Sequence, residues 1–114
     1  MVDDEPSILE LLSRALSSAD CEVDTASNGP LALERVNTRE YDLLITDLRM
    51  PGMSGLNVIR EARNADAKLP VIVITGYSSE ANAIDAVNLW VSGYVTKPFK
   101  IPRVLEVAAK ALNA

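Results

Sequence analysis

Hydrophobic and polar positions along the chain follow two alternating spacings, one helical and one typical of strands. In the first segment, apolar residues recur every three or four positions from Ile8 to Ala19, and Pro6 suits the first turn of a helix. Four later segments are also predicted to be helical. The predicted helices cover Pro6–Ala19, Gly29 to about Arg39, Ser54 to about Asn64, Ser79 to about Val91, and Ile101–Leu112.

Short apolar runs between these helices have the features of strands. Val71–Ile74 is continuous and β-branched, as in a strand buried on both faces, whereas Glu22–Ala26 alternates polar and apolar residues, as in an edge strand. Leu43–Ile45 and Tyr94–Thr96 are further short strands, and Leu48–Ser54 is predicted to be a loop. Strands that alternate with helices in this way indicate an open, doubly wound α/β domain with a parallel sheet.

The composition is that of one folded domain over residues 1–114. Hydrophobic residues make up 48% and charged residues 24%, which excludes disordered and collagen-like chains. The net charge of −5 argues against direct nucleic-acid binding by this domain and against binding to an anionic membrane surface. No apolar run approaches the roughly 18 residues of a membrane span. The single cysteine, Cys21, cannot form an internal disulfide, so a reducing, cytoplasmic location is expected.

Polar side chains suited to metal and phosphate chemistry follow the predicted strands. They are Asp3 and Asp4 after a first strand stub, Asp47, Thr75, and Lys97. The carboxyl ends of parallel strands meet at one edge of such a sheet. Because the chain has no histidine, oxygen ligands there would select a hard cation such as Mg²⁺. The three carboxylates balance Mg²⁺ and Lys97 in charge. The metal, Lys97 and Thr75 could then meet the added charge of an acyl phosphate.

Four motifs resemble those of the receiver domain of two-component response regulators. They are VDDEPS at 2–7, TDLRMPGMSG at 46–55, VIVITGYSS at 71–79 and GYVTKPFK at 93–100. They cover essentially the whole chain, in order and with the right spacing. The resemblance implies a flavodoxin-like fold, with a five-stranded parallel sheet of order 2-1-3-4-5 and helices on both faces.

The resemblance also implies the phosphoacceptor and the metal ligands. Asp47 would take a phosphoryl group from the phosphohistidine of a sensor histidine kinase or a phosphotransfer protein. Mg²⁺ would be bound by Asp47, by Asp4 directly, by Asp3 through water, and by the backbone carbonyl of Arg49. Without this context, the acidic pair before Pro6 would be read as ordinary helix-start chemistry.

The remaining roles concern the response to phosphorylation. By the same resemblance, Lys97 would pair with the phosphoryl group, Thr75 would hydrogen-bond it, and Tyr94 would be the aromatic switch that moves with Thr75. The switch would act on the face formed by the fourth helix, the fifth strand and the last helix, within residues 79–112. That face would control an output domain or a partner, and it is a candidate homodimer surface.

The first strand departs from the family pattern. Receivers normally have a longer apolar run before the acidic pair, whereas Met1 and Val2 alone precede Asp3 here. We therefore expect a truncated first strand, and a chain start inside the domain fits it better than a naturally short strand. Because this strand is central, its neighbours would lose hydrogen-bond partners. Low stability, or completion of the sheet by another copy, is the expected consequence.

Three classes of function remain open. The first is a signalling module that catalyses its own phosphorylation and dephosphorylation, with no multiple-turnover substrate. The second is an aspartyl-phosphate phosphohydrolase, which would need a second acid two residues after its nucleophile, where this chain has Arg49. The third is a phosphorylation-independent docking or dimerisation module. Such modules typically lose an acid, the threonine or the lysine, and this chain retains all of them. The residues favour the first class.

Overall fold

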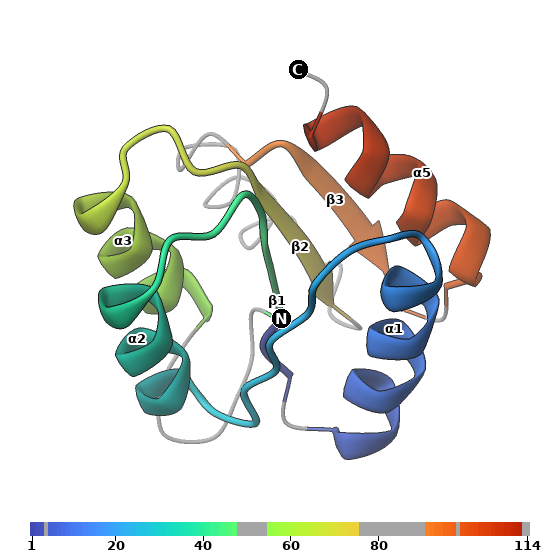
Figure 1. The fold of residues 1–114 in the computed structure, drawn as a ribbon, viewed down its shortest axis with the longest axis horizontal. Helices are drawn as coiled ribbons and strands as arrows, with labels where there is room; N and C mark the ends of the chain where they lie inside the picture. The colour runs from blue at the N-terminus through green and yellow to red at the C-terminus, as the bar shows by residue number, and fades with distance from the viewer. Residues whose placement is uncertain (4, 48–54, 76–90, 98, 113–114) are drawn as a thin grey trace.

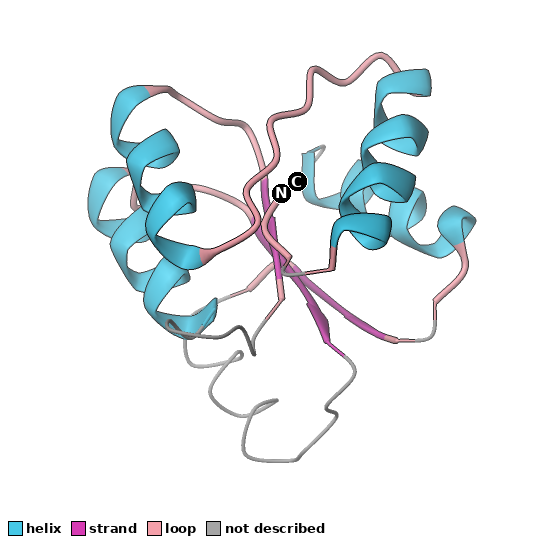
Figure 2. Cartoon of the chain, turned by 90° about the horizontal axis from the view of Figure 1, so that it is seen from below, coloured by secondary structure: helices cyan, strands magenta, loops and turns pink. Residues whose placement is uncertain are grey.

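The chain folds into three layers, with parallel strands between two pairs of helices (Figures 1 and 2). The computed structural model describes residues 1–3, 5–47, 55–75, 91–97 and 99–112. Helices α1 (Pro6–Ser18) and α5 (Ile101–Leu112) contact each other on one face of the sheet. Helices α2 (Gly29–Thr38) and α3 (Gly55–Ala65) contact each other on the opposite face. The predicted doubly wound α/β fold is confirmed.

The sheet has the strand order that the resemblance implies. Its strands β1 (Leu44–Thr46), β2 (Val71–Thr75) and β3 (Gly93–Thr96) pair in parallel in that order. Val2 extends the sheet beyond β1, because it forms one parallel bridge to Thr46 and another to Ala26. Numbered along the chain, the segments at Val2 and Ala26 are the first and second strands and β1 is the third. Their order across the sheet is therefore 2-1-3-4-5.

Both expected strands at the amino-terminal side of the sheet are reduced to one bridging residue each, Val2 and Ala26. Ala26 N–H donates to the Met1 carbonyl (2.8 Å), and Asp3 N–H donates to the Ala26 carbonyl (3.2 Å). The prediction of a full edge strand at Glu22–Ala26 is wrong, because Ala26 is the one residue of this segment that forms a bridge, to Val2. In the segment expected to be the first strand, Val2 is the residue that forms bridges.

The helix boundaries follow the local signals in the sequence. Pro6 occupies the first turn of α1, and the Asn28 side chain accepts a hydrogen bond from Leu31 N–H (2.8 Å) at the start of α2. The loop predicted at 48–54 lies outside the described residues, and so does the helix predicted at 79–91 except for its last residue, Val91. No helix in the part of the chain that the structure describes is long and apolar enough to cross a membrane.

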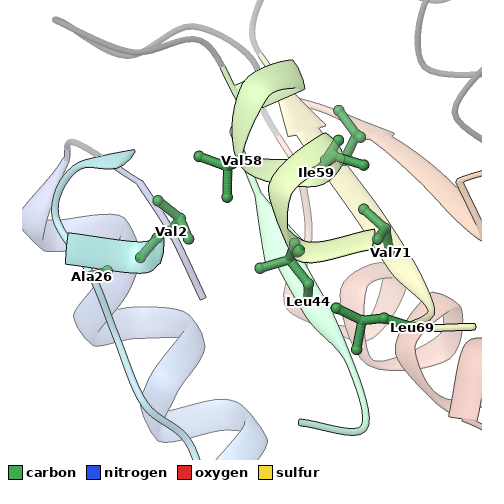
Figure 3. Packing of buried hydrophobic residues seen from close by; sticks show 10 residues of the cluster. Val2, Ala26, Leu44, Val58, Ile59, Leu69 and Val71 are labelled. Carbon is green, nitrogen blue, oxygen red and sulfur yellow. The ribbon is translucent and has the colours of Figure 1, made fainter. Parts of the chain in front are cut away.

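Side chains from both faces of β2 are buried, as the sequence predicts for Val71–Ile74. Val71 and Val73 pack toward α3, in a cluster that includes Val58 and Ile59 (Figure 3). The alternate residues of β2 belong to a second cluster, together with residues of α1 and α5; they are Ile72 and Ile74, packed with Leu12, Leu16, Val104 and Ala108. The sheet therefore separates two apolar clusters, and its backbone is shielded from water on both faces.

The buried amino group of Met1 makes the stability of this chain depend on pH. It donates a hydrogen bond to the Asp24 carbonyl (2.9 Å), and burial lowers its pKa from 8.0 to about 6 in spite of the nearby Asp24 carboxylate. The unfolded chain therefore binds this proton more tightly than the folded chain does. We expect the free energy of unfolding to rise by about 2 kcal/mol between pH 6 and pH 8.

Urea unfolding at a series of pH values, on protein shown by mass spectrometry to retain Met1, measures this rise. The chain has no histidine, so no side chain has an ordinary pKa in this window. An Nα-acetylated chain, which has no titrating amine, is the control and should give a flat profile. An equal rise in the acetylated chain would assign the effect to another group.

Candidate functional site

Three polar residues that the sequence places after strands meet at the carboxyl edge of the sheet. Val2 pairs with Thr46, so Asp3 and Asp47 lie at the same level on neighbouring segments. Asp47 N–H also donates to the Val2 carbonyl (3.0 Å), which fixes the spacing of the two segments. Lys97 directly follows β3, two strands away from Asp47. The parallel register thus brings residues separated by up to 94 positions to one edge.

The ammonium group of Lys97 lies at the centre of this cluster. Its Nζ is 3.0 Å from Asp3 Oδ2, 3.0 Å from Asp47 Oδ2 and 3.2 Å from Glu5 Oε1. The side chains of Asp3, Asp47 and Lys97 are only 5%, 7% and 16% exposed. Buried charges are tolerated where they are paired and hydrogen-bonded, as these are. Three carboxylates face one ammonium, so the cluster retains net negative charge and favours a further cation.

The pKa values of the cluster reflect burial and ion pairing together. Burial raises the pKa of the Asp3 carboxyl, in spite of hydrogen bonds from Glu5 N–H and Lys97. Burial alone would lower the pKa of Lys97, but its hydrogen bonds to Asp3 and Asp47 outweigh this and raise it. Lys97 is therefore charged at neutral pH. It supplies a fixed positive charge beside Asp47.

Asp3 serves the start of α1 as well as the cluster. Its Oδ1 accepts the N–H of Glu5 (2.9 Å), and its Oδ2 accepts from Lys97. Asp3 therefore accepts a backbone hydrogen bond at the start of α1 and also pairs with Lys97, whereas its role as a metal ligand stays a prediction. Because both oxygens are held, the position of this carboxylate is fixed relative to Asp47.

Of the other predicted site residues, Thr75 and Tyr94 lie on strands of the sheet, and the rest lie outside the described residues. Thr75 is the last residue of β2 and pairs in register with Thr96, directly before Lys97. Tyr94 is the second residue of β3 and is half-buried, and its hydroxyl oxygen has no hydrogen-bond partner among the described residues. Asp4 and Arg49 lie outside the described residues.

Sequence reasoning missed two residues of the site. Glu5 shares Lys97 with the two aspartates, and Thr46 is fully buried and donates through Oγ1 to the Asp47 carbonyl (2.9 Å). The signal for Glu5 was its position next to the acidic pair. Thr46 immediately precedes the phosphoacceptor candidate, and a hydroxyl within an apolar strand needs a partner inside the protein.

The donor set fits a hard cation such as Mg²⁺. Asp3 and Asp47 each place one carboxylate oxygen 3.0 Å from Lys97 Nζ, so the two carboxylates lie close together, and the chain has no histidine that could add a nitrogen ligand. Within the described ranges, no group of three acidic, cysteine or histidine residues is arranged to hold a metal ion. Further ligands would have to come from Asp4 and from the carbonyl of Arg49, as the resemblance implies.

Comparisons with known proteins agree with this geometry. The sequence model of the response regulator receiver domain matches residues 1–109. The DNA-binding transcriptional regulator NtrC of Escherichia coli (strain K12) is 34% identical over 113 residues, which are 99% of this chain and 24% of that protein. The transcriptional regulatory protein PhoP of Bacillus subtilis, for alkaline phosphatase synthesis, is 33% identical over 98% of this chain and 46% of that protein. The chain therefore spans less than half the length of these relatives.

Solved structures give the same result. A CheY-like receiver domain protein from Methanospirillum hungatei superposes with a TM-score of 0.94 at 26% identity, covering 98% of this chain and 90% of that chain. The response regulator TrrA from Thermotoga maritima, in complex with Mg²⁺ and BeF, superposes with a TM-score of 0.87 at 39% identity, covering 97% and 95%. The chain therefore belongs to the response regulator receiver domain family, whose members act as phosphoacceptors in two-component signalling.

Proposed function

We propose that Asp47 of this chain accepts a phosphoryl group from a sensor histidine kinase or a phosphotransfer protein. The observation that supports this most directly is the pairing of the buried Asp47 carboxylate with Lys97, beside Asp3. An Asp47 oxygen attacks phosphorus, the phosphorus–nitrogen bond of the donor phosphohistidine breaks, and its electron pair stays on the imidazole, which takes up a proton. The product is an acyl phosphate on Asp47.

Residues around Asp47 are suited to this transfer. Receiver domains bind Mg²⁺ in general, and here Asp3, Asp4, Asp47 and the carbonyl of Arg49 would hold it. The metal would neutralise charge on the phosphoryl oxygens. Lys97 is charged and already within 3.0 Å of Asp47, so it can follow the new phosphoryl oxygens with little movement.

Phosphorylation would be transmitted through Thr75 and Tyr94. Thr75 ends β2 beside the cluster and would hydrogen-bond a phosphoryl oxygen. Tyr94, on the neighbouring strand, pairs in register with Val73, two residues before Thr75. Its buried hydroxyl, without a partner among the described residues, is the feature expected of a ring with a second position available. The output would be control of an attached domain or partner through the face that includes β3 and α5, within one domain over residues 1–114.

Reaction of the chain with acetyl phosphate tests this function. In the presence of Mg²⁺ we expect stoichiometric phosphorylation, detected by intact-protein mass spectrometry, and none in excess EDTA. Turnover of the phosphate donor without accumulation of phosphoprotein would instead support a phosphohydrolase. Retention of Mg²⁺ binding without phosphorylation would support a docking module.

A further inference from the structure

The N–H groups of the Lys97 ammonium are all engaged in the structure. A lysine ammonium carries three donors and no acceptor. Here they are donated to Asp3 Oδ2 (3.0 Å), Asp47 Oδ2 (3.0 Å) and Glu5 Oε1 (3.2 Å). A group that arrives beside Asp47 can therefore bind the ammonium only where one of these carboxylates gives up its hydrogen bond.

Phosphorylation changes what the ammonium has to satisfy. The Asp47 carboxyl becomes an uncharged acyl group, which frees one donor. A phosphoryl group in turn brings three strong acceptor oxygens and a charge of about −2. One donor is a poor match for such a group. A second donor can come only from the hydrogen bond to Asp3 or from the hydrogen bond to Glu5.

The two remaining carboxylates differ in how much they would lose. The side chain of Asp3 is buried, whereas that of Glu5 is 56% exposed. A buried carboxylate that loses its cation is left poorly solvated, which is costly. An exposed carboxylate exchanges its cation for water at little cost. Glu5 is therefore the partner that the Lys97 ammonium can release.

The side chain of Glu5 is also independent of the start of α1. Its backbone N–H donates to Asp3 Oδ1 (2.9 Å), and its carbonyl accepts from Leu9 N–H (3.2 Å). A residue at this position often accepts a backbone N–H of the first helical turn with its side chain, but Glu5 makes no such bond. Its carboxylate contacts Lys97 instead. A change of the side chain thus leaves the helix start and the hold on Asp3 in place.

We propose that Glu5 is a positioning residue that holds Lys97 in the unphosphorylated site and yields its hydrogen bond to a phosphoryl oxygen. This inference rests on the proposed phosphorylation of Asp47. Glu5 acts through Lys97 and does not bind the phosphoryl group itself. Its side chain stabilises the unphosphorylated arrangement of the ammonium, so its removal should favour the phosphorylated one.

The Glu5→Ala variant tests this role with beryllium fluoride as the phosphoryl analogue. In saturating Mg²⁺ we expect its dissociation constant for beryllium fluoride to fall about threefold, the scale of one partly exposed ion pair. The affinity for Mg²⁺ alone should not rise, because the variant loses a negative charge near the carboxylates. A gain in the affinity for beryllium fluoride would therefore not come from the metal.

Glu10→Ala is the matched control. Glu10 is an exposed acid on α1 that pairs with Arg14 (2.8 Å), so the variant undergoes the same change of charge away from Lys97. Its affinity for beryllium fluoride should equal that of the unmodified chain. In the protein without metal, the proton–nitrogen NMR signal of the Lys97 ammonium should shift in Glu5→Ala and stay in place in Glu10→Ala. A purely structural role of Glu5 would not move this signal.

The outcomes separate this inference from the function on which it rests. Equal dissociation constants for beryllium fluoride in Glu5→Ala and the unmodified chain would overturn the role of Glu5 alone. An equal gain in Glu10→Ala, or a Lys97 signal that does not shift in Glu5→Ala, would overturn it as well. An unmodified chain that binds no beryllium fluoride in Mg²⁺ would instead contradict the proposed function, and this inference with it.

Discussion

The Asp47→Asn variant is expected to take up phosphate from acetyl phosphate at least about a thousandfold more slowly than the unmodified chain. Loss of a catalytic nucleophile in a well-studied hydrolase costs a factor of about 10⁶, so this estimate is conservative. The amide has the shape of the carboxylate but is a poor nucleophile for phosphorus. The fold should survive, because Lys97 retains Asp3 and Glu5 as partners.

Asp24→Asn is the matched control for this experiment. Asp24 is also a partly buried aspartate with a hydroxyl and an arginine as partners, but it lies at the opposite edge of the sheet. That variant should be phosphorylated as the unmodified chain is. Intact-protein mass spectrometry after equal incubation compares the three proteins, and circular dichroism checks that each is folded. Stoichiometric labelling of the Asp47→Asn variant would mean that another residue is the phosphoacceptor.

The carboxyl edge of the sheet could be predicted because strand ends are visible in the sequence. Asp47 and Lys97 each stop a short apolar run, and a parallel sheet places such positions at one edge. That argument needs no knowledge of side-chain conformation. It identifies which residues come close, and the structure confirms it for Asp3, Asp47 and Lys97.

Contacts that depend on side-chain direction could not be predicted in the same way. Glu5 lies in the turn before α1, and nothing in its spacing shows that it reaches a lysine 92 positions away. Tyr41 and Asp24 likewise meet across 17 positions from two irregular segments. The edge strand at Glu22–Ala26 was overpredicted for a different reason. Alternation describes the segment's own faces, whereas a strand also requires a partner with enough residues to pair.

The second large effect is expected for Lys97→Ala, which removes the cation between two buried carboxylates. Without metal, the carboxylates of Asp3 and Asp47 then lie close together with no ammonium group between them. Breaking a buried ion pair by removing one partner typically costs 3–5 kcal/mol, so we expect a loss of about 3 kcal/mol in the free energy of unfolding in EDTA. Mg²⁺ should restore much of this loss, because it supplies positive charge to the same carboxylates.

The same variant should retain Mg²⁺ binding but lose most of its response to a phosphoryl group. The Lys97 ammonium and the metal would bind the same two carboxylates, those of Asp3 and Asp47. Removing the ammonium therefore does not reduce the negative charge that attracts Mg²⁺. The phosphoryl group, in contrast, loses the ammonium that lies 3.0 Å from Asp47 Oδ2 in the unmodified chain. Beryllium fluoride with Mg²⁺ should therefore raise the melting temperature of the unmodified chain clearly more than that of the variant.

Lys110→Ala provides the control for both measurements. Lys110 pairs with Glu106 on the surface of α5, and its side chain is 77% exposed. Its removal should change stability by less than about 0.5 kcal/mol, with or without Mg²⁺. Urea unfolding of the three proteins in EDTA and in saturating Mg²⁺ makes the comparison. If Lys97→Ala lost the same stability in both solutions, the charge of Lys97 and that of the metal would not act on the same carboxylates. The cluster would then owe its stability to packing around the lysine stem, which charge replacement does not restore.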